Sequence, residues 1–353
     1  MSDTAVPPLI ETIPLAADAI RGASSLVLAC HVNPDGDALG SMLGLALALA
    51  PLGQSLTLLS QDGVPDIYKF LPGADRVRQT TEVESFDLAV VLDSGDLSRV
   101  GSRVRPLIAR ARRVIDIDHH ALAGAFGDIR VLHALAASTS EIVYVLLEAL
   151  GLPITPDVAT CLFTGVITDT GSFRFQNVTP STFLIAAALL NAGAPPAAIS
   201  ENVFENRTFA ATKLLGHALC SLSQTPDGRV VWAHITAQDF AALGAADEDT
   251  EGVVNYVRGV RGADVGLLFR EMADGKIRIS LRSRESVNVA EVAQRFGGGG
   301  HKMAAGCTLA APLPEAEHLV VQAVRAALPS NAPSHPGLLA PSAGEGGEPR
   351  RAG

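Results

Sequence analysis

The feature that most constrains the fold is a short apolar run that ends in a Pro/Asp/Gly loop and leads into an Ala/Leu-rich helix pattern. The run covers residues 25–31, the loop reads NPDGD, and the helix pattern covers residues 38–50. Further apolar runs at 56–59, 87–92 and 114–117 are separated by helical stretches. Buried parallel strands joined by helices have this pattern. The N-terminal part is therefore expected to form a parallel α/β domain.

Four more helix patterns follow, and then the pattern changes. The helices are expected at 138–150, 156–168, 179–191 and 208–222. Ser138 or Thr139 is the expected N-cap of the first of them, and Gly151 its end. After the turn-forming segment QTPDG, strand-like runs cover 230–235, 263–271 and 276–281. The last two are expected to pair as a hairpin across 273–275.

These patterns predict an α/β protein of two domains, because 353 residues exceed what one hydrophobic core usually organises. A parallel-sheet domain is expected over residues 1–195, a helical linker over 196–224 and a smaller α+β domain over 225–329. Residues 330–353 are rich in Pro, Gly, Ser and Ala, so we expect a disordered tail there.

Composition argues against several classes of protein. The net charge of −10 disfavours general binding to duplex DNA, which needs many Lys and Arg side chains to neutralise phosphates. The four cysteines form no C-x-x-C pair, so neither a disulfide framework nor a thiolate zinc site is expected. The apolar stretch at 42–52 is shorter than the roughly 18 residues of a spanning helix, and the N-terminus has no basic signal region. We therefore expect no membrane segment and a cytoplasmic location.

Charge is unevenly distributed along the chain. Residues 1–195 hold 12 basic and 20 acidic residues, whereas residues 258–302 hold 9 basic and 5 acidic ones. Surplus carboxylates suit cations and a basic patch suits phosphate, so a cleft between the halves is expected to bind a phosphoester together with metal. Ordinary solvated faces are the alternative.

Side chains of the kind that bind metals follow three of the expected strands, where the carboxyl ends of parallel strands place ligands. They are His31, Asp35, Asp37, Asp93, Asp118, His119 and His120. Another carboxylate, Asp169, ends a helix pattern within the segment ITDTGSF. Carboxylates packed this closely repel each other unless a cation lies between them. Asp and His without Cys suit a pair of divalent ions such as Mn²⁺.

Each motif also has a purely structural interpretation. The first could be a solvated turn in which Asp37 caps the next helix, and Asp118 could be a cap beside two surface histidines. Coincidence at three strand ends is a poor explanation, which favours a shared site.

A glycine run marks the second domain. Arg282 precedes it, and the segment GGGGHK ends in His301 and Lys302. Unshielded backbone N–H groups beside basic side chains predict a phosphate-binding cradle. A flexible loop is the alternative, although a helix-like segment and a strand-like run at 307–309 flank the glycines.

Together, the motifs HVNPDGDALGS, VLDSGD, DHH, ITDTGSF and GGGGHKMAAG resemble the ordered motif set of the DHH/DHHA1 phosphoesterase family, over residues 26–309. Within that family the two-domain layout is similar to the NrnA-type nanoRNases. The resemblance implies a hydrolase that degrades very short RNAs to mononucleotides and removes the 3′-phosphate of adenosine 3′,5′-bisphosphate (pAp). Short single-stranded RNA and pAp are the implied substrates. The oligomeric state stays open, with a homodimer as the candidate.

The resemblance also implies a role for each motif residue. Two ligand sets follow: His31, Asp35 and Asp93 for one Mn²⁺, and Asp37, Asp93, His119 and Asp169 for the other. Asp93 would bridge the two ions, and catalysis would depend on it and on His120, which matches the position that binds or protonates the reacting phosphate. Asp118 would orient His119 from behind. The substrate-binding positions would be Arg282, Asn288, Gly298, Gly299 and His301.

Two other functions stay open. A stand-alone phosphodiesterase of cyclic dinucleotides or pApA could use the same two domains. A non-catalytic metal- or RNA-binding module would show as lost ligands, whereas every implied metal and catalytic position has a competent side chain.

Overall fold

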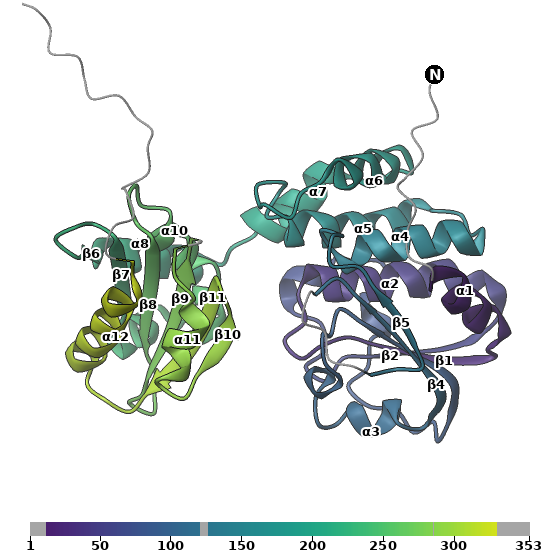
Figure 1. Ribbon diagram of the computed structural model, residues 1–353, viewed down its shortest axis with the longest axis horizontal. Helices are drawn as coiled ribbons and strands as arrows, with labels where there is room; N and C mark the ends of the chain where they lie inside the picture. Colours follow the sequence, from purple (N-terminus) through teal and green to yellow (C-terminus); the bar gives the residue numbers. More distant parts are fainter. Residues whose placement is uncertain (1–11, 121–125, 285, 330–353) are drawn as a thin grey trace, which may run out of the picture. The chain divides into compact units, whose positions relative to one another are not determined.

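The computed structural model describes residues 12–120, 126–284 and 286–329 (Figure 1). The chain divides into two compact units, with the division between Asn206 and Arg207. The tail expected over 330–353 lies outside the described residues.

The first unit contains the expected parallel sheet, with the strand order β2-β1-β3-β4-β5. Its strands are β1 (Ser25–Ala29), β2 (Ser55–Leu59), β3 (Phe86–Leu92), β4 (Ala111–Asp118) and β5 (Ile129–Leu132). β5 was not predicted from the sequence, because it is short and its exposed Arg130 interrupts the apolar run. The strands β1, β3 and β4 are neighbours, so their carboxyl ends lie side by side.

Helices cover both faces of this sheet. They are α1 (Ile13–Gly22), α2 (Gly36–Leu49), α3 (Arg105–Ile108), α4 (Thr139–Leu150), α5 (Pro156–Asp169), α6 (Pro180–Asn191) and α7 (Pro196–Ser200). One core joins α1, α2, α4, α5 and α6 to strand residues such as Leu28 and Val90. A smaller core packs α3 against the other face, through residues such as Val27 and Ala89.

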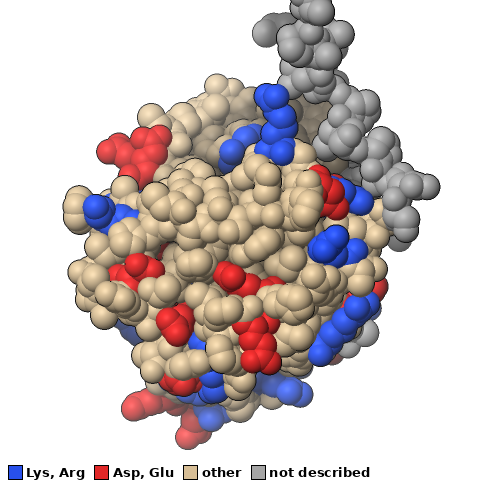
Figure 2. Space-filling model, turned by 90° about the vertical axis from the view of Figure 1, so that its left-hand side faces the viewer, with Lys and Arg blue, Asp and Glu red and all other residues tan. Residues whose placement is uncertain are grey.

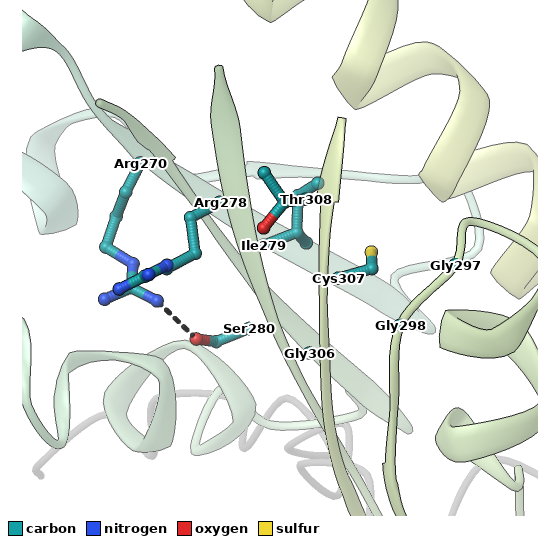
Figure 3. A pocket seen from close by; sticks show the side chains of 9 residues that line it. All are labelled: Arg270, Arg278, Ile279, Ser280, Gly297, Gly298, Gly306, Cys307 and Thr308. Carbon is teal, nitrogen blue, oxygen red and sulfur yellow. Dashed lines mark hydrogen bonds between the residues drawn. The ribbon is translucent and has the colours of Figure 1, made fainter. Parts of the chain in front are cut away.

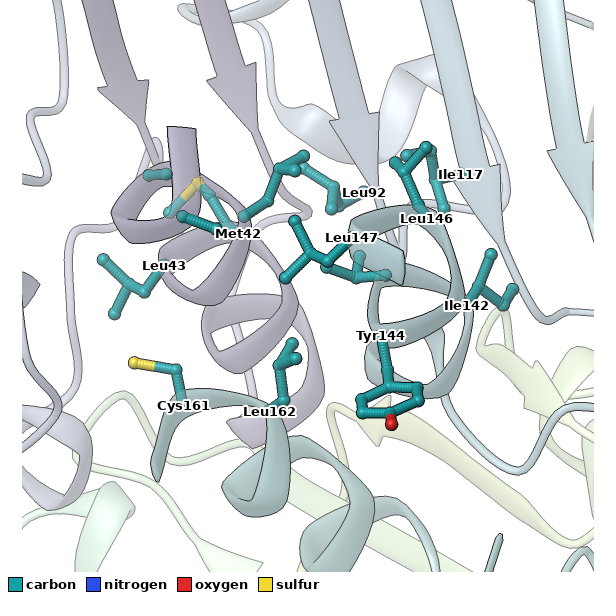
Figure 4. Packing of buried hydrophobic residues seen from close by; sticks show 14 of the residues in the cluster. Met42, Leu43, Leu92, Ile117, Ile142, Tyr144, Leu146, Leu147, Cys161 and Leu162 are labelled. Carbon is teal, nitrogen blue, oxygen red and sulfur yellow. The ribbon is translucent and has the colours of Figure 1, made fainter. Parts of the chain in front are cut away.

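The helix α2 lies at the centre of the larger core. Figure 4 shows Met42 of α2 among side chains of α4 and α5 and of the ends of β3 and β4. Close packing of α2 against α5 depends on Gly40, because a Cβ there would lie 2.4 Å from the Cys161 carbonyl oxygen. This contact brings the start of α2 next to the end of α5, where a Cβ on Gly36 would lie 2.5 Å from the Thr168 side chain.

The second unit is a smaller α+β structure, as expected. Its six strands have the order β10-β11-β9-β8-β7-β6, in which only β7 and β8 are parallel. They are β6 (Ser223–Gln224), β7 (Val230–Ile235), β8 (Val265–Glu271), β9 (Ile277–Ser283), β10 (Gly299–His301) and β11 (Ala304–Leu309). The predicted hairpin joins β8 and β9. β10 lies in the glycine run, so part of that run is a strand paired with β11.

Helices pack on both faces of this second sheet as well. α8 (Phe209–Cys220) and α10 (Val253–Arg258) pack on one face with Val231 and Leu268, near α9 (Ala237–Leu243). α11 (Val289–Gln294) and α12 (Leu313–Ala327) pack on the other face with Val265 and Leu281. Short turns of 3-10 helix and one π-helix complete the described elements: η1 (Ala50–Leu52), η2 (Asp66–Tyr68), η3 (Ala74–Arg76), η4 (Leu97–Val100), η5 (Glu201–Glu205) and η6 (Asp247–Thr250).

Among the described residues, no helix taken singly has both the length and the apolar composition to cross a membrane. A bent pair, Pro180–Asn191 with Pro196–Glu205 at 114°, meets those two criteria only when the helices are taken together.

Candidate metal centre

The carboxyl ends of β1, β3 and β4 bring the first site residues together. His31 lies two residues beyond β1, Asp93 directly follows β3, and Asp118 ends β4. Asp93 is 2% exposed, and its backbone has a φ of +57°. Its N–H donates to the Ile117 carbonyl oxygen at 3.0 Å, so pairing with β4 continues through this residue. A left-handed backbone at a residue other than glycine is typical of functional sites.

A first group of donor atoms comes from His31, Asp35 and Asp93, whose ligand atoms lie within 4.8 Å of one another. His31 Nε2 is 3.6 Å from Asp93 Oδ2 and 3.8 Å from Asp35 Oδ1. The other ring nitrogen, Nδ1, lies 2.8 Å from the Val32 carbonyl oxygen, which turns Nε2 toward the carboxylates. Asp35 also caps α2, because its Oδ1 accepts from the N–H groups of Asp37 and Ala38.

A second group comes from Asp37, His119 and Asp169, again with ligand atoms within 4.8 Å of one another. His119 Nε2 is 3.1 Å from Asp169 Oδ2 and 3.5 Å from Asp93 Oδ1. The two oxygens of Asp93 therefore face different groups, Oδ2 toward His31 and Oδ1 toward His119.

The start of α4 supports the carboxylates of both groups. Asp37 accepts from the N–H of Thr139 at 2.6 Å and from the N–H of Ser140 at 2.9 Å, and Thr139 Oγ1 donates to Asp93 Oδ1 at 3.0 Å. A helix N-terminus stabilises negative charge. Gly165 leaves the necessary space, since a Cβ there would lie 2.5 Å from Asp37 Oδ1. Thr139 and Ser140 were not among the predicted site residues, because the run Ser-Thr-Ser indicates only an N-cap, which is Ser138.

Burial and mutual repulsion disfavour the ionised forms of these acids. Burial raises the pKa of Asp93 and of Asp169 well above the usual range, and the charges of Asp37 and Asp35 raise both further. Burial also raises the pKa of Asp37, against the charge of His119, which lowers it. For His119 itself burial lowers the pKa, but the charges of Asp37 and Asp93 outweigh it and the pKa is raised.

The donor set fits divalent cations. Each group offers carboxylate oxygens and one imidazole nitrogen, with no thiolate, and borderline ions such as Mn²⁺ prefer such a mixture. A cation at each group would offset the burial and the mutual repulsion that raise the pKa values of the acids, and it would let them bind in the ionised form.

Asp118 orients a different histidine from the one we expected. Its Oδ1 lies 2.6 Å from His120 Nδ1 and accepts from the His120 N–H at 2.8 Å, whereas His119 Nδ1 faces the Ala136 carbonyl oxygen at 3.3 Å. The prediction that Asp118 orients His119 is therefore wrong. β4 ends at Asp118, and beyond that end both histidines face Asp93 Oδ1, His119 at 3.5 Å and His120 at 3.7 Å. Burial raises the pKa of Asp118, but its hydrogen bonds and charge interaction with His120 lower it more, so the carboxylate stays ionised.

The expected substrate-binding positions lie in the second unit. Arg282 is half-buried on β9, and its Nη1 donates to the Leu281 carbonyl oxygen at 3.1 Å. Asn288 is the N-cap of α11, since its Oδ1 accepts from the Ala290 N–H at 3.2 Å. This bond gives Asn288 a structural role in addition to the expected one.

The two expected glycines differ in their surroundings. A Cβ on Gly298 would lie 2.1 Å from the Gly306 carbonyl oxygen, so strand packing alone requires glycine there. By contrast, no described atom lies within 4 Å of a Cβ built on Gly299, and the space beside it is open. The backbone of His301 belongs to β10, and its side chain lies outside what is described.

Basic side chains are dispersed on the surface that Figure 2 draws. Lys and Arg are interspersed there with Asp and Glu, and they do not gather in one stripe. That face therefore lacks the continuous basic track along which long nucleic acids bind.

Comparison with protein families matches both units. The model described as "DHH family, N-terminal domain" matches residues 25–166, and the "DHHA1 domain" matches residues 230–329.

Individual proteins match over most of their length. A Thermus thermophilus protein named bifunctional oligoribonuclease and PAP phosphatase NrnA is 34% identical over 319 residues, covering 89% of this chain and 94% of that protein. A Bacillus subtilis protein of the same name is 27% identical over 290 residues, covering 81% of this chain and 89% of that protein. Among solved structures, an exopolyphosphatase-related protein from Bacteroides fragilis superimposes with a TM-score of 0.85 at 27% identity, covering 89% of this chain and 96% of that one.

Proposed function

This chain belongs to the DHH/DHHA1 phosphoesterase family, and from that premise we propose that it hydrolyses short oligoribonucleotides to mononucleotides and removes the 3′-phosphate of pAp. The relatives named for these two activities match nearly the whole chain. The observation that supports the proposal best is Asp93, whose two oxygens face separate groups of donor atoms. One carboxylate between two such groups is typical of hydrolases that use paired ions on phosphoesters.

We propose that both groups bind a divalent ion, most simply Mn²⁺. His31, Asp35 and Asp93 would bind one, and Asp37, Asp93, His119 and Asp169 the other. When bound, such ions supply Lewis-acid stabilisation of charge at phosphorus and a nucleophile at neutral pH. Thr139 keeps Asp93 in place through its hydroxyl, and the start of α4 does the same for Asp37.

His120 is the proposed proton donor to the leaving ribose oxygen. Its Nδ1–H is held by Asp118, so the proton is donated from Nε2 on the opposite side of the ring. The fully buried Asp118 carboxylate fixes the orientation of the His120 ring through this contact. The same pair works for both substrates, because an RNA linkage and the 3′-phosphate of pAp both release a ribose oxygen.

Arg282 and the backbone N–H groups near Gly299 are the proposed contacts for a substrate phosphate. A guanidinium keeps its charge at every physiological pH and binds phosphate in a fixed geometry. The open space beside Gly299 leaves room for such a group.

The test is a ranking of initial rates for the purified protein with Mn²⁺. The substrates are pAp, cyclic di-AMP and single-stranded RNAs from two to roughly 24 nucleotides, since proteins that grip long strands use extended grooves. We expect pAp and the shortest RNAs to be hydrolysed fastest. Faster hydrolysis of cyclic di-AMP or of the longest RNA would contradict the proposal. Asp93→Asn is the control for contaminating nucleases.

A further inference from the structure

A pocket on the sheet of the second unit is lined mainly by residues that have no part in the reaction proposed above. Its volume is about 320 Å³, and Arg270, Arg278, Ser280, Gly298, Gly306 and Thr308 are among the residues that line it (Figure 3). These residues come from β8, β9, β11 and the glycine run.

The pocket lies where two small residues, Ser280 and Gly306, are neighbours on the sheet. On this face α8 and α10 pack with Leu268 of β8. Its partner on β9 is Ser280, and the partner of Ser280 on β11 is Gly306. A hydroxyl and a glycine leave space on the sheet at this point, and Ile279, Gly297 and Cys307 also line the pocket.

Two arginines face each other along the side of this hollow. Arg270 and Arg278 are cross-strand partners on β8 and β9. Asp247 pairs with both, through Arg270 Nη1 at 2.7 Å and through Arg278 Nη1. Arg270 Nη1 also donates to Thr250 Oγ1 at 2.9 Å, and its Nη2 donates to Ser280 Oγ at 3.1 Å.

Arg270, Arg278 and Asp247 together carry one net positive charge. Like charges directly opposite each other on neighbouring strands are unfavourable unless a further anion compensates them. Arg270 Nε is buried and has no hydrogen-bond partner within the described part of the chain. A buried donor without a partner is costly, so the side of the pocket is short of an acceptor.

The pocket lies along the same strand as the proposed phosphate contact. Every second residue of β9 lies on one face of the strand, and on this face are Arg278, Ser280 and Arg282. The Cα atoms of Arg278 and Arg282 are about 13 Å apart at roughly 3.3 Å per residue. No ion pair joins Arg282 to a carboxylate of the described residues; instead burial, Arg258 and Arg270 lower its pKa. An oligonucleotide, whose phosphates repeat along its backbone, can place one phosphate at each arginine.

We propose that the Arg270/Arg278 pocket binds a backbone phosphate of oligoribonucleotide substrates, separate from the phosphate held at Arg282. The pocket is then a determinant of substrate length: RNAs of three or more nucleotides use it, and pAp does not. This inference rests on the proposed function.

The test uses Arg278→Ala, because this side chain is 50% exposed and its removal leaves the contacts of Arg270 with Asp247 and Ser280 in place. We expect KM for a tri- or pentanucleotide to rise about tenfold, the usual effect of losing a hydrogen bond to a charged group, with KM for pAp unchanged. The salt dependence of kcat/KM on the pentanucleotide should weaken by about 0.7 in the log–log slope, as for one lost contact to a single strand. The matched control is Lys276→Ala, which removes a basic side chain of the same hairpin that pairs with Asp274 at 2.7 Å.

The outcomes separate this inference from the proposed function. Wild-type protein that hydrolyses neither pAp nor short RNA would overturn both. Wild-type protein that hydrolyses both, with an Arg278→Ala variant of unchanged KM at every length, would overturn only the pocket. So would an equal rise of KM for pAp and the pentanucleotide, or an equal effect of Lys276→Ala. A melting temperature equal to that of the wild type shows that the variant is folded.

Discussion

The substitution Asp116→Asn should stabilise the protein, increasingly so as the pH rises. Asp116 lies on β4 and is fully buried, and neither of its carboxylate oxygens has a hydrogen-bond partner among the described residues. Burial raises its pKa to about 8, and the neighbouring charge of Asp118 adds to the effect. Asparagine has the same shape and never ionises.

The magnitude follows from linkage between protonation and folding. The folded carboxyl keeps its proton up to about pH 8, whereas the unfolded one has the usual pKa of 3.8. Because the folded state binds more protons in this window, the free energy of unfolding decreases as the pH rises through it. At about 1.36 kcal/mol per pH unit, roughly three units between pH 5 and pH 8 give a loss of up to about 4 kcal/mol. The variant should not show this loss.

Urea unfolding followed at about pH 5, 7 and 9 measures the difference between wild type and variant. The difference should grow by several kcal/mol from the lowest to the highest pH, with and without Mn²⁺. Asp75→Asn, at an exposed carboxylate, is the matched control and should show no such growth. A difference that is constant with pH, or a variant less stable than wild type at pH 9, would refute the reasoning.

Four further predictions concern the site. Asp93→Asn should abolish hydrolysis while the fold is kept, because Asn tolerates the left-handed backbone. A variant that binds two ions by calorimetry and turns over substrate at the wild-type rate would contradict the metal assignment. Asp118→Asn should lower kcat by about 10- to 100-fold with little change in KM, as expected when the orientation of a catalytic histidine is disturbed, and an unchanged pH–rate profile would count against the role of His120. Gly298→Ala should lower the melting temperature, because its Cβ would lie 2.1 Å from a backbone oxygen, whereas Gly299→Ala should leave the melting temperature unchanged. Equal melting temperatures for the two variants would contradict this packing. Mn²⁺ should raise the melting temperature of the first unit and chelator should reverse the shift, since the buried carboxylates repel each other without a cation; no shift at saturating Mn²⁺ would argue against the centre.

Local patterns in the sequence were sufficient for much of the fold. The apolar runs that became β1 and β3 are uninterrupted, and that of β4 is broken only by Asp116, so their positions and parallel pairing could be predicted. The expected strand over 230–235 coincides with β7. Because parallel strands end at one edge, the sequence also indicated that His31, Asp93 and His119 would lie near each other.

Elements without a pattern of their own could not be predicted. The short strands β5, β6 and β10 exist because a neighbouring strand offers hydrogen-bond partners, and a glycine run has no side chains whose periodicity could reveal a strand. The pocket beside Arg270 likewise depends on which residues pair across β8, β9 and β11.

The supporting contacts of the site were decided by tertiary structure alone. Asp37 accepts from Thr139 and Ser140, more than a hundred residues away along the chain, and Gly165 on α5 leaves the space for that contact. The partner of Asp118 is likewise known only from the folded structure, in which its Oδ1 lies 2.6 Å from His120 Nδ1. Residue types and local spacing indicate which groups can perform the chemistry. Which of them meet, and which backbone groups hold them, depends on contacts between distant segments, and these form only when the chain is folded.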